Sequence, residues 1–223
     1  MNKGFFADVL AARPLLWEAM IRADCAGCGP ASSAGELAEC AEKIGGASLR
    51  AWLLRPLRRH GAEGETSSFW DYAEESRRLA LLAGPDLDAL CRVAGSALHA
   101  PEIARTLRRE EVLALRHALG EELYRYALHR GQYQLGGVRR LFARLHPSLP
   151  LAERCALHGS MALRLVASGW PAELARRFFS KLPDAPLTQD VPEFGEAEIR
   201  DVWIALKKLL LKEVAPAWTP CFD

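Results

Sequence analysis

The chain has 223 residues, half of them apolar and about a quarter charged, a composition typical of one soluble globular domain or of one domain with a small appendage. Its 29 lysines and arginines nearly balance its 28 aspartates and glutamates, so a net charge of +1 gives no overall attraction to nucleic acid or anionic lipid. The apolar runs are far shorter than the ~20 residues of a membrane span, and the N-terminus lacks the sustained apolar core of a signal peptide. We therefore expect a cytoplasmic protein whose six cysteines are thiols.

The N-terminal part of the chain has two clear helical signals. Residues 5–21 carry apolar side chains at helical spacing, and Ser33 with Glu36 forms a capping pattern that starts a second helix. Residues 60–68 contain no apolar side chain larger than alanine, which is typical of a linker or a surface loop.

The domain boundary follows from this linker. We predict an N-terminal helical portion over residues 1–66 and a main helical domain over residues 67–223, with one single domain over 1–223 as the alternative.

Beyond the linker, glycine and proline repeatedly interrupt apolar stripes of helical period. The expected helices lie near residues 69–80, 85–98, 101–119, 123–131, 138–145, 151–165, 171–178 and 199–210. We expect Ile103, Leu107, Leu115 and Leu119 to share one face of the third of these, and residues after Pro216 to form a short tail. The fold class predicted is all-α: a compact multi-helix domain of about ten helices without a significant sheet.

Cysteine spacing raises the possibility of a metal or redox site. Cys25 and Cys28 form a C-x-x-C motif, but a structural zinc site needs four ligands and no second pair is present. A Gly-rich turn holding two thiols is the favoured interpretation, and an enzyme built around this pair stays an alternative. Cys91 and Cys155 fall on apolar stripes and are expected to be small core residues.

The six histidines show no ligand spacing, so we expect packed or helix-capping roles for them. The sequence also lacks a G-x-S-x-G elbow and both common phosphate-binding glycine patterns. We therefore predict no catalytic residues, no cofactor and no metal.

Charged clusters are the remaining candidates for function. Residues 182–199 contain no base, and the arginine-rich helix near residues 101–119 has paired arginines at its centre. Solvated surface explains both features, but complementary charge also steers partner proteins together. The candidate protein-binding residues are Arg105, Arg108, Arg109, Asp184, Asp190, Glu193 and Glu196.

Three stretches resemble a known family. They are "LDALCRVAGSALHAPEIARTLRREEVLALRHALG", "GSMALRLVASGWPAELARRFFSKLP" and the closing "LKKLLLKEVAPAW". From about Leu87 to the end, their order is similar to the K component (YscK/SctK family) of the bacterial type III secretion sorting platform. The first 86 residues carry no part of this resemblance.

The resemblance implies a cytoplasmic adaptor without catalytic activity, located at the cytoplasmic face of the inner membrane when assembled. The implied partners are the cytoplasmic domain of the inner-membrane ring protein and the pod (C-ring) protein that carries the ATPase. Neither nucleic acid nor direct membrane insertion is implied.

An alternative function is nucleic-acid binding through an arginine-rich face. Residues 101–144 carry nine arginines against five glutamates. The near-zero net charge and the absence of a helix-turn-helix signature make this the less favoured hypothesis.

Overall fold

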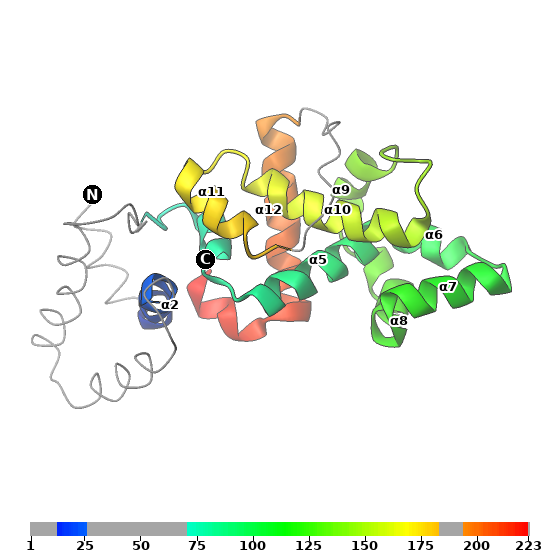
Figure 1. Ribbon diagram of the computed structural model, residues 1–223, viewed down its shortest axis with the longest axis horizontal. Coiled ribbons are helices and arrows are strands. Elements are labelled where there is room, and N and C mark those ends of the chain that lie inside the picture. Colours follow the sequence, from blue (N-terminus) through cyan, green and yellow to red (C-terminus); the bar gives the residue numbers. More distant parts are fainter. Residues whose placement is uncertain (1–12, 26–70, 183–193, 223) are drawn as a thin grey trace, which may run out of the picture. The chain divides into compact units, whose positions relative to one another are not determined.

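Every regular element in the described part of the chain is helical, which confirms the all-α prediction (Figure 1). The computed structural model describes residues 13–25, 71–182 and 194–222. The chain divides into two units, Met1–Glu74 and Glu75–Asp223. None of the described helices is both long and apolar enough to serve as a membrane span.

The first unit contains one described helix, α2 (Pro14–Cys25). It buries Leu16, Trp17 and Met20, which lie on the apolar stripe expected from the sequence. The predicted capping pattern at Ser33, the partner thiol Cys28 and the linker at 60–68 lie outside the described residues.

The second unit begins with a short 3-10 helix and continues through α-helices joined by short turns. Its elements are η1 (Glu75–Leu81), α5 (Gly84–Leu98), α6 (Ala100–Arg105), α7 (Arg109–Leu119), α8 (Glu121–His129), η2 (Gly131–Tyr133), α9 (Gly136–Phe142), α10 (Leu151–Val166), α11 (Ala172–Phe179), α12 (Glu196–Leu209), η3 (Leu210–Val214, π-helical) and η4 (Pro216–Cys221). Helices α5 and α10 pack side by side, and α12 contacts both (Figure 1).

Local sequence explains most helix boundaries. Proline occupies the first turn of α5 and α6, where a missing N–H costs nothing. Gly120, with φ of 83°, ends α7 in a conformation that disfavours other residues. At the start of α12, the Glu198 carboxylate accepts a hydrogen bond from the Gly195 N–H at 2.9 Å.

Three local predictions were wrong. The helix expected from Phe69 to Ala80 is the 3-10 helix η1, which begins only at Glu75. The helix expected at 101–119 is broken at Thr106–Arg108, so Leu107 leaves the buried face. The tail after Pro216 is the helix η4, which buries Cys221 because it packs back onto the unit.

The contact between α5 and α10 depends on two glycines. A Cβ atom on Gly95 of α5 would lie 1.8 Å from the carbonyl oxygen of Cys155, and one on Gly159 of α10 would lie 2.0 Å from that of Cys91. The two helices therefore touch backbone to backbone. Cys91 and Cys155 are buried at this contact, as predicted, and burial raises the pKa of each thiol to about 12.

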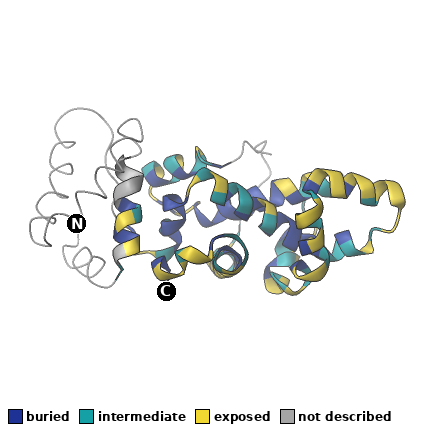
Figure 2. Ribbon diagram, turned by 90° about the horizontal axis from the view of Figure 1, so that it is seen from below, coloured by how far each residue is buried: buried dark blue, intermediate teal, exposed yellow. Residues whose placement is uncertain are grey.

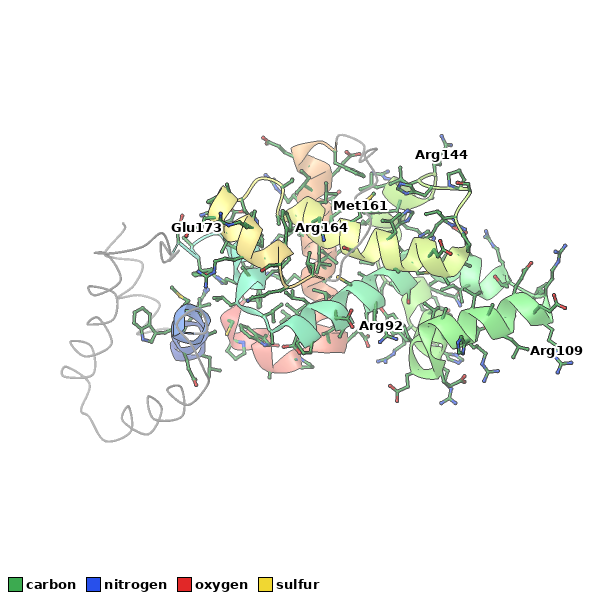
Figure 3. All side chains as sticks on the ribbon, in the orientation of Figure 1. Arg92, Arg109, Arg144, Met161, Arg164 and Glu173 are labelled. Atoms are coloured by element: carbon green, nitrogen blue, oxygen red, sulfur yellow. The ribbon has the colours of Figure 1, made fainter. Side chains whose placement is uncertain are left out.

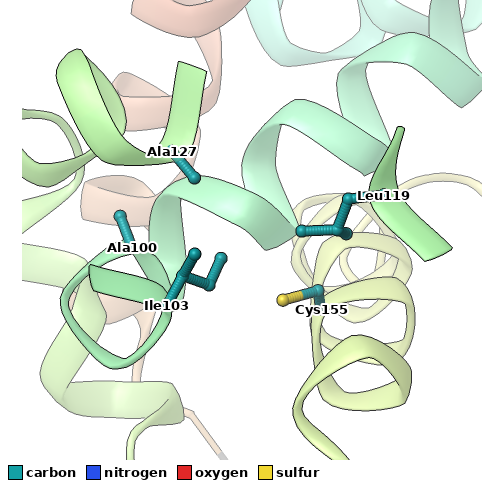
Figure 4. Packing of buried hydrophobic residues seen from close by; sticks show 5 residues of the cluster. All are labelled: Ala100, Ile103, Leu119, Ala127 and Cys155. Atoms are coloured by element: carbon teal, nitrogen blue, oxygen red, sulfur yellow. The ribbon is translucent and has the colours of Figure 1, made fainter. Parts of the chain in front are cut away.

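A second buried cluster joins four helices at the α6–α7 end of the unit. Ala100 and Ile103 of α6 pack with Leu119 of α7, Ala127 of α8 and Cys155 of α10 (Figure 4). Burial of these apolar side chains fixes the orientation of α6 and α7. The surface that these two helices carry is thus held on a rigid support.

Cationic side chains satisfy helix ends inside the unit. The Arg139 guanidinium donates hydrogen bonds to the carbonyl oxygens of Ala97, Leu98, Gly131, Gln132 and Gln134 at 3.0–3.3 Å. Ala97 and Leu98 are the last residues of α5, where unpaired carbonyls and the helix dipole favour a cation. Arg139 therefore ties α9 to α5 and to the turn at Gly131–Gln134.

Candidate functional site

The connection between α6 and α7 forms an exposed corner that carries three arginines and is followed by Glu110 and Glu111 in the first turn of α7. We call it the basic tip and define it as Arg105, Leu107, Arg108, Arg109 and Leu113. All five side chains are exposed, with Leu107 at 89% and Leu113 at 51% of their full accessible area. Exposed residues cover much of α7 at this end (Figure 2), and Arg109 extends away from the unit (Figure 3).

Backbone geometry produces the tip. Thr106 and Arg108 are both extended, with φ and ψ of −73° and 113° and of −69° and 126°. The Thr106 hydroxyl donates to the carbonyl oxygen of Glu102 at 3.1 Å, which satisfies one of the last acceptors of α6. The break turns Leu107 outward between Arg105 and Arg108.

The charges at the tip are largely available to a partner. Arg108 lies 3.5 Å from Glu111, but both side chains are exposed, so this pair contributes little to stability. An exposed leucine between arginines suits a partner surface with an apolar pocket and an acidic rim. The contact role of the three arginines stays a prediction from the sequence. Helical spacing assigned Leu107 to the core, which its exposure shows to be wrong.

The predicted acidic surface is only partly described. Glu196 is exposed in the first turn of α12, where a carboxylate complements the helix dipole. Asp184, Asp190 and Glu193 lie outside the described residues. The acidic contact surface stays a prediction.

The structure brings together three histidines that the sequence did not connect. His99 Nε2 lies 2.8 Å from His158 Nδ1, and His158 Nε2 lies 3.1 Å from His146 Nδ1. At the other end, Glu102 lies 3.2 Å from His99 Nδ1 and 2.6 Å from Arg154. We call these five residues the histidine chain; it links α5, α6, α10 and the turn before α10.

The histidine chain has one consistent arrangement of protons. The Glu102 carboxylate accepts from His99 Nδ1–H, so a neutral His99 accepts at Nε2 from His158 Nδ1–H. His158 then accepts at Nε2 from His146 Nδ1–H. Each contact therefore holds one proton when His99 and His158 are neutral.

Burial explains why these two rings stay neutral. His99 is almost completely buried and His158 completely so. Desolvation lowers the pKa of His99, and it lowers that of His158 to about 3. The cation Arg154 adds to the effect on His158, because a positive charge nearby disfavours a second one.

The geometry indicates a packed hydrogen-bond network and not a ligand set. The facing nitrogens bind one another, so they do not converge on a common point. No group of histidine, cysteine or carboxylate side chains suited to a metal ion occurs among residues the structure describes.

Many arginines of the 101–144 region are used within the chain. Arg116 and Arg125 pair with Glu121, and Arg130 pairs with Glu213 at 2.9 Å. Arg139 points inward to carbonyl oxygens. These four arginines do not form an unpaired cationic face for a phosphate backbone.

Comparison with known proteins identifies the family. No curated protein and no solved structure matches the chain. A family model, YOP proteins translocation protein K (YscK), matches residues 48–222, which extends the similarity well to the N-terminal side of Leu87. This match covers most of the second unit and the end of the first. The chain therefore belongs to the YscK family and is a component of a type III secretion system.

Proposed function

We propose that this chain is a non-catalytic adaptor of the type III secretion sorting platform. In this role it links the cytoplasmic domain of the inner-membrane ring protein to the pods that carry the ATPase, at the cytoplasmic face of the inner membrane. The observation that carries the proposal is the basic tip, an exposed apolar and cationic surface on a chain of the YscK family.

The packing of α6 and α7 beneath the basic tip favours recognition of a partner by a preformed surface. The buried cluster of Ile103, Leu119 and their neighbours orients α6 and α7 before any partner arrives. A partner therefore loses little free energy to ordering this surface, and affinity depends on Leu107 and the surrounding arginines. Exposed charges of this kind mainly raise the association rate and make binding sensitive to salt.

The experiment reverses charge at the tip. The variant Arg108→Glu/Arg109→Glu is compared with wild type in quantitative affinity purification of secretion components from the native cell, over a series of salt concentrations. Because both side chains are exposed, we expect an unchanged fold and at least a tenfold loss of one bound component at low salt.

A matched control distinguishes the loss of a specific contact surface from the effect of the change in net charge. Arg140→Glu/Arg144→Glu makes the same change in net charge at two exposed arginines outside the tip. Recovery of the partners should be unaffected by this control. Equal losses in both variants, or no loss in the tip variant, would remove the tip from the interface.

A further inference from the structure

The second unit also has an open groove of about 710 Å³, and none of the residues that line it belongs to the basic tip. One wall is the turn around Tyr133, Leu135 and Gly136, and the other is the face of α12 and η3 that carries Ile204, Lys208 and Lys212. We call it the α12 groove. Its volume is in the range that accommodates several side chains of a bound molecule.

Both walls contain unusual backbone. Leu135 has φ of 52°, a left-handed conformation that is rare for a bulky residue. The opposite wall contains the π-helical turn Leu210–Val214, in which the Ala215 N–H donates to the Leu210 carbonyl oxygen at 2.8 Å. Strained residues and π-helical turns concentrate at functional sites, and here Leu135 and Lys212 of the π-helical turn line the same groove.

The groove exposes apolar side chains. Tyr133 is 87% and Ile204 42% exposed, one on each wall. Large exposed apolar side chains on both walls of a depression mark a surface that gains free energy when a partner covers it.

The charge of the groove is positive. Lys208 and Lys212 are exposed, and neither has an acidic partner within the part of the chain described here. Glu213 lies nearby, but its carboxylate forms an ion pair with Arg130 at 2.9 Å, and Arg130 therefore already compensates its charge. The same carboxylate accepts a hydrogen bond from the Gln134 amide at 2.9 Å. Asp201 is the acidic residue among those that line the groove, so the two lysines outnumber it.

We propose that the α12 groove binds an acidic amphipathic segment of a partner protein. Apolar side chains of that segment cover Tyr133 and Ile204, and its carboxylates pair with Lys208 and Lys212. The inference rests on the proposed adaptor function for the existence of a second partner. The chemistry of the partner segment follows from the groove alone.

The test places a photocrosslinking amino acid at Tyr133 of the full chain in the native cell. The crosslinked peptide is then identified by mass spectrometry. We expect a segment of another protein that carries several carboxylates and apolar residues at helical spacing. The same substitution at Arg176, an exposed residue of α11 outside the groove, provides the background level.

Charge variants test the role of the lysines. Lys208→Glu/Lys212→Glu should lower the crosslink yield at least tenfold, whereas Lys208→Arg/Lys212→Arg should keep it within about twofold. A yield no higher than at Arg176 would overturn the inference, as would a captured segment from the chain itself, a segment without acidic residues, or a yield unaffected by charge reversal.

The result separates this inference from the proposed function. If the chain is an adaptor but the groove is not a binding site, a crosslinker at Leu107 captures a secretion component while Tyr133 gives only background. If the groove binds an acidic segment from a protein outside the secretion apparatus, and the crosslinker at Leu107 captures no secretion component, the inference stands and the adaptor function fails.

Discussion

Adding one methyl group to Gly159 tests the contact that holds α5 against α10. A Cβ atom there would lie 2.0 Å from the Cys91 carbonyl oxygen, whereas ordinary contacts begin near 3.4 Å. The helices must therefore separate by about 1.4 Å at this point. Because the opposing atom belongs to a backbone, no side-chain rotation can relieve the overlap.

The expected free-energy change combines two opposing effects. Alanine favours the helix by roughly 0.5–1 kcal/mol relative to glycine. Overpacking against a rigid backbone costs up to about 3 kcal/mol. We expect Gly159→Ala to lower the free energy of unfolding by about 2 kcal/mol, which lowers the melting temperature by about 4–8 °C.

The assay is urea and thermal unfolding followed by circular dichroism at 222 nm. Gly137→Ala is the matched control, because nothing lies within 4 Å of a Cβ atom at that helical position. It should be neutral or slightly stabilising. A Gly159→Ala protein that melts at or above the wild-type temperature would refute the close packing of α5 and α10.

Two further predictions concern buried polar groups. The pKa of His158 is about 3 in the folded protein and near 6.5 in the unfolded chain. Below pH 6.5 the unfolded chain therefore binds a proton that the folded protein does not, so the free energy of unfolding is highest above pH 6.5 and decreases as the pH falls toward 3. Between pH 6.5 and 4.5, the free energy of unfolding measured in urea should fall by up to about 1.4 kcal/mol per pH unit because of this residue, and His158→Gln should reduce this dependence on pH. The same pH dependence in wild type and His158→Gln would contradict the histidine chain. Arg139→Met removes the donor to five carbonyl oxygens and should cost about 2–4 kcal/mol in the same assay, while Arg140→Met, at an exposed position, should change stability by less than about 0.5 kcal/mol. Similar stability of the two variants would show that Arg139 does not hold α5, α9 and the turn together.

Local signals predicted much of the fold. Pro85 and Pro101 mark the starts of α5 and α6, and Gly120 marks the end of α7, because each acts on the backbone of its own turn. Cys91 and Cys155 were predicted as core residues from helical period alone, and both are buried. These features depend on neighbours within a few residues.

Long-range contacts explain what the sequence did not reveal. His99 and His158 are 59 residues apart, and no spacing rule connects them. Gly95 and Gly159 lie inside helices, where glycine is intrinsically unfavourable, and only the contact with the opposite helix shows why a residue without a Cβ atom is needed there. Leu107 has helical spacing, but Thr106 and Arg108 are extended, so helical periodicity alone wrongly predicted that Leu107 is buried.

In the candidate site too, local features could be predicted from the sequence and long-range contacts could not. The arginines of the basic tip were visible as a charge pattern, and the structure places Arg105, Arg108 and Arg109 on one exposed corner. The α12 groove was not predicted, because its walls come from segments about 70 residues apart in the sequence. Its one sequence signal is Gly136-Gly137, which permits a tight turn but does not indicate what lies opposite.

The most direct test of the adaptor function is affinity purification of the unmodified full chain from its native cell, with quantitative identification of everything bound. The proposal predicts stoichiometric recovery of two components of the type III secretion apparatus, one from the inner-membrane ring and one from the pods. Recovery of nucleic acid, of a single component, or of no partner would contradict it.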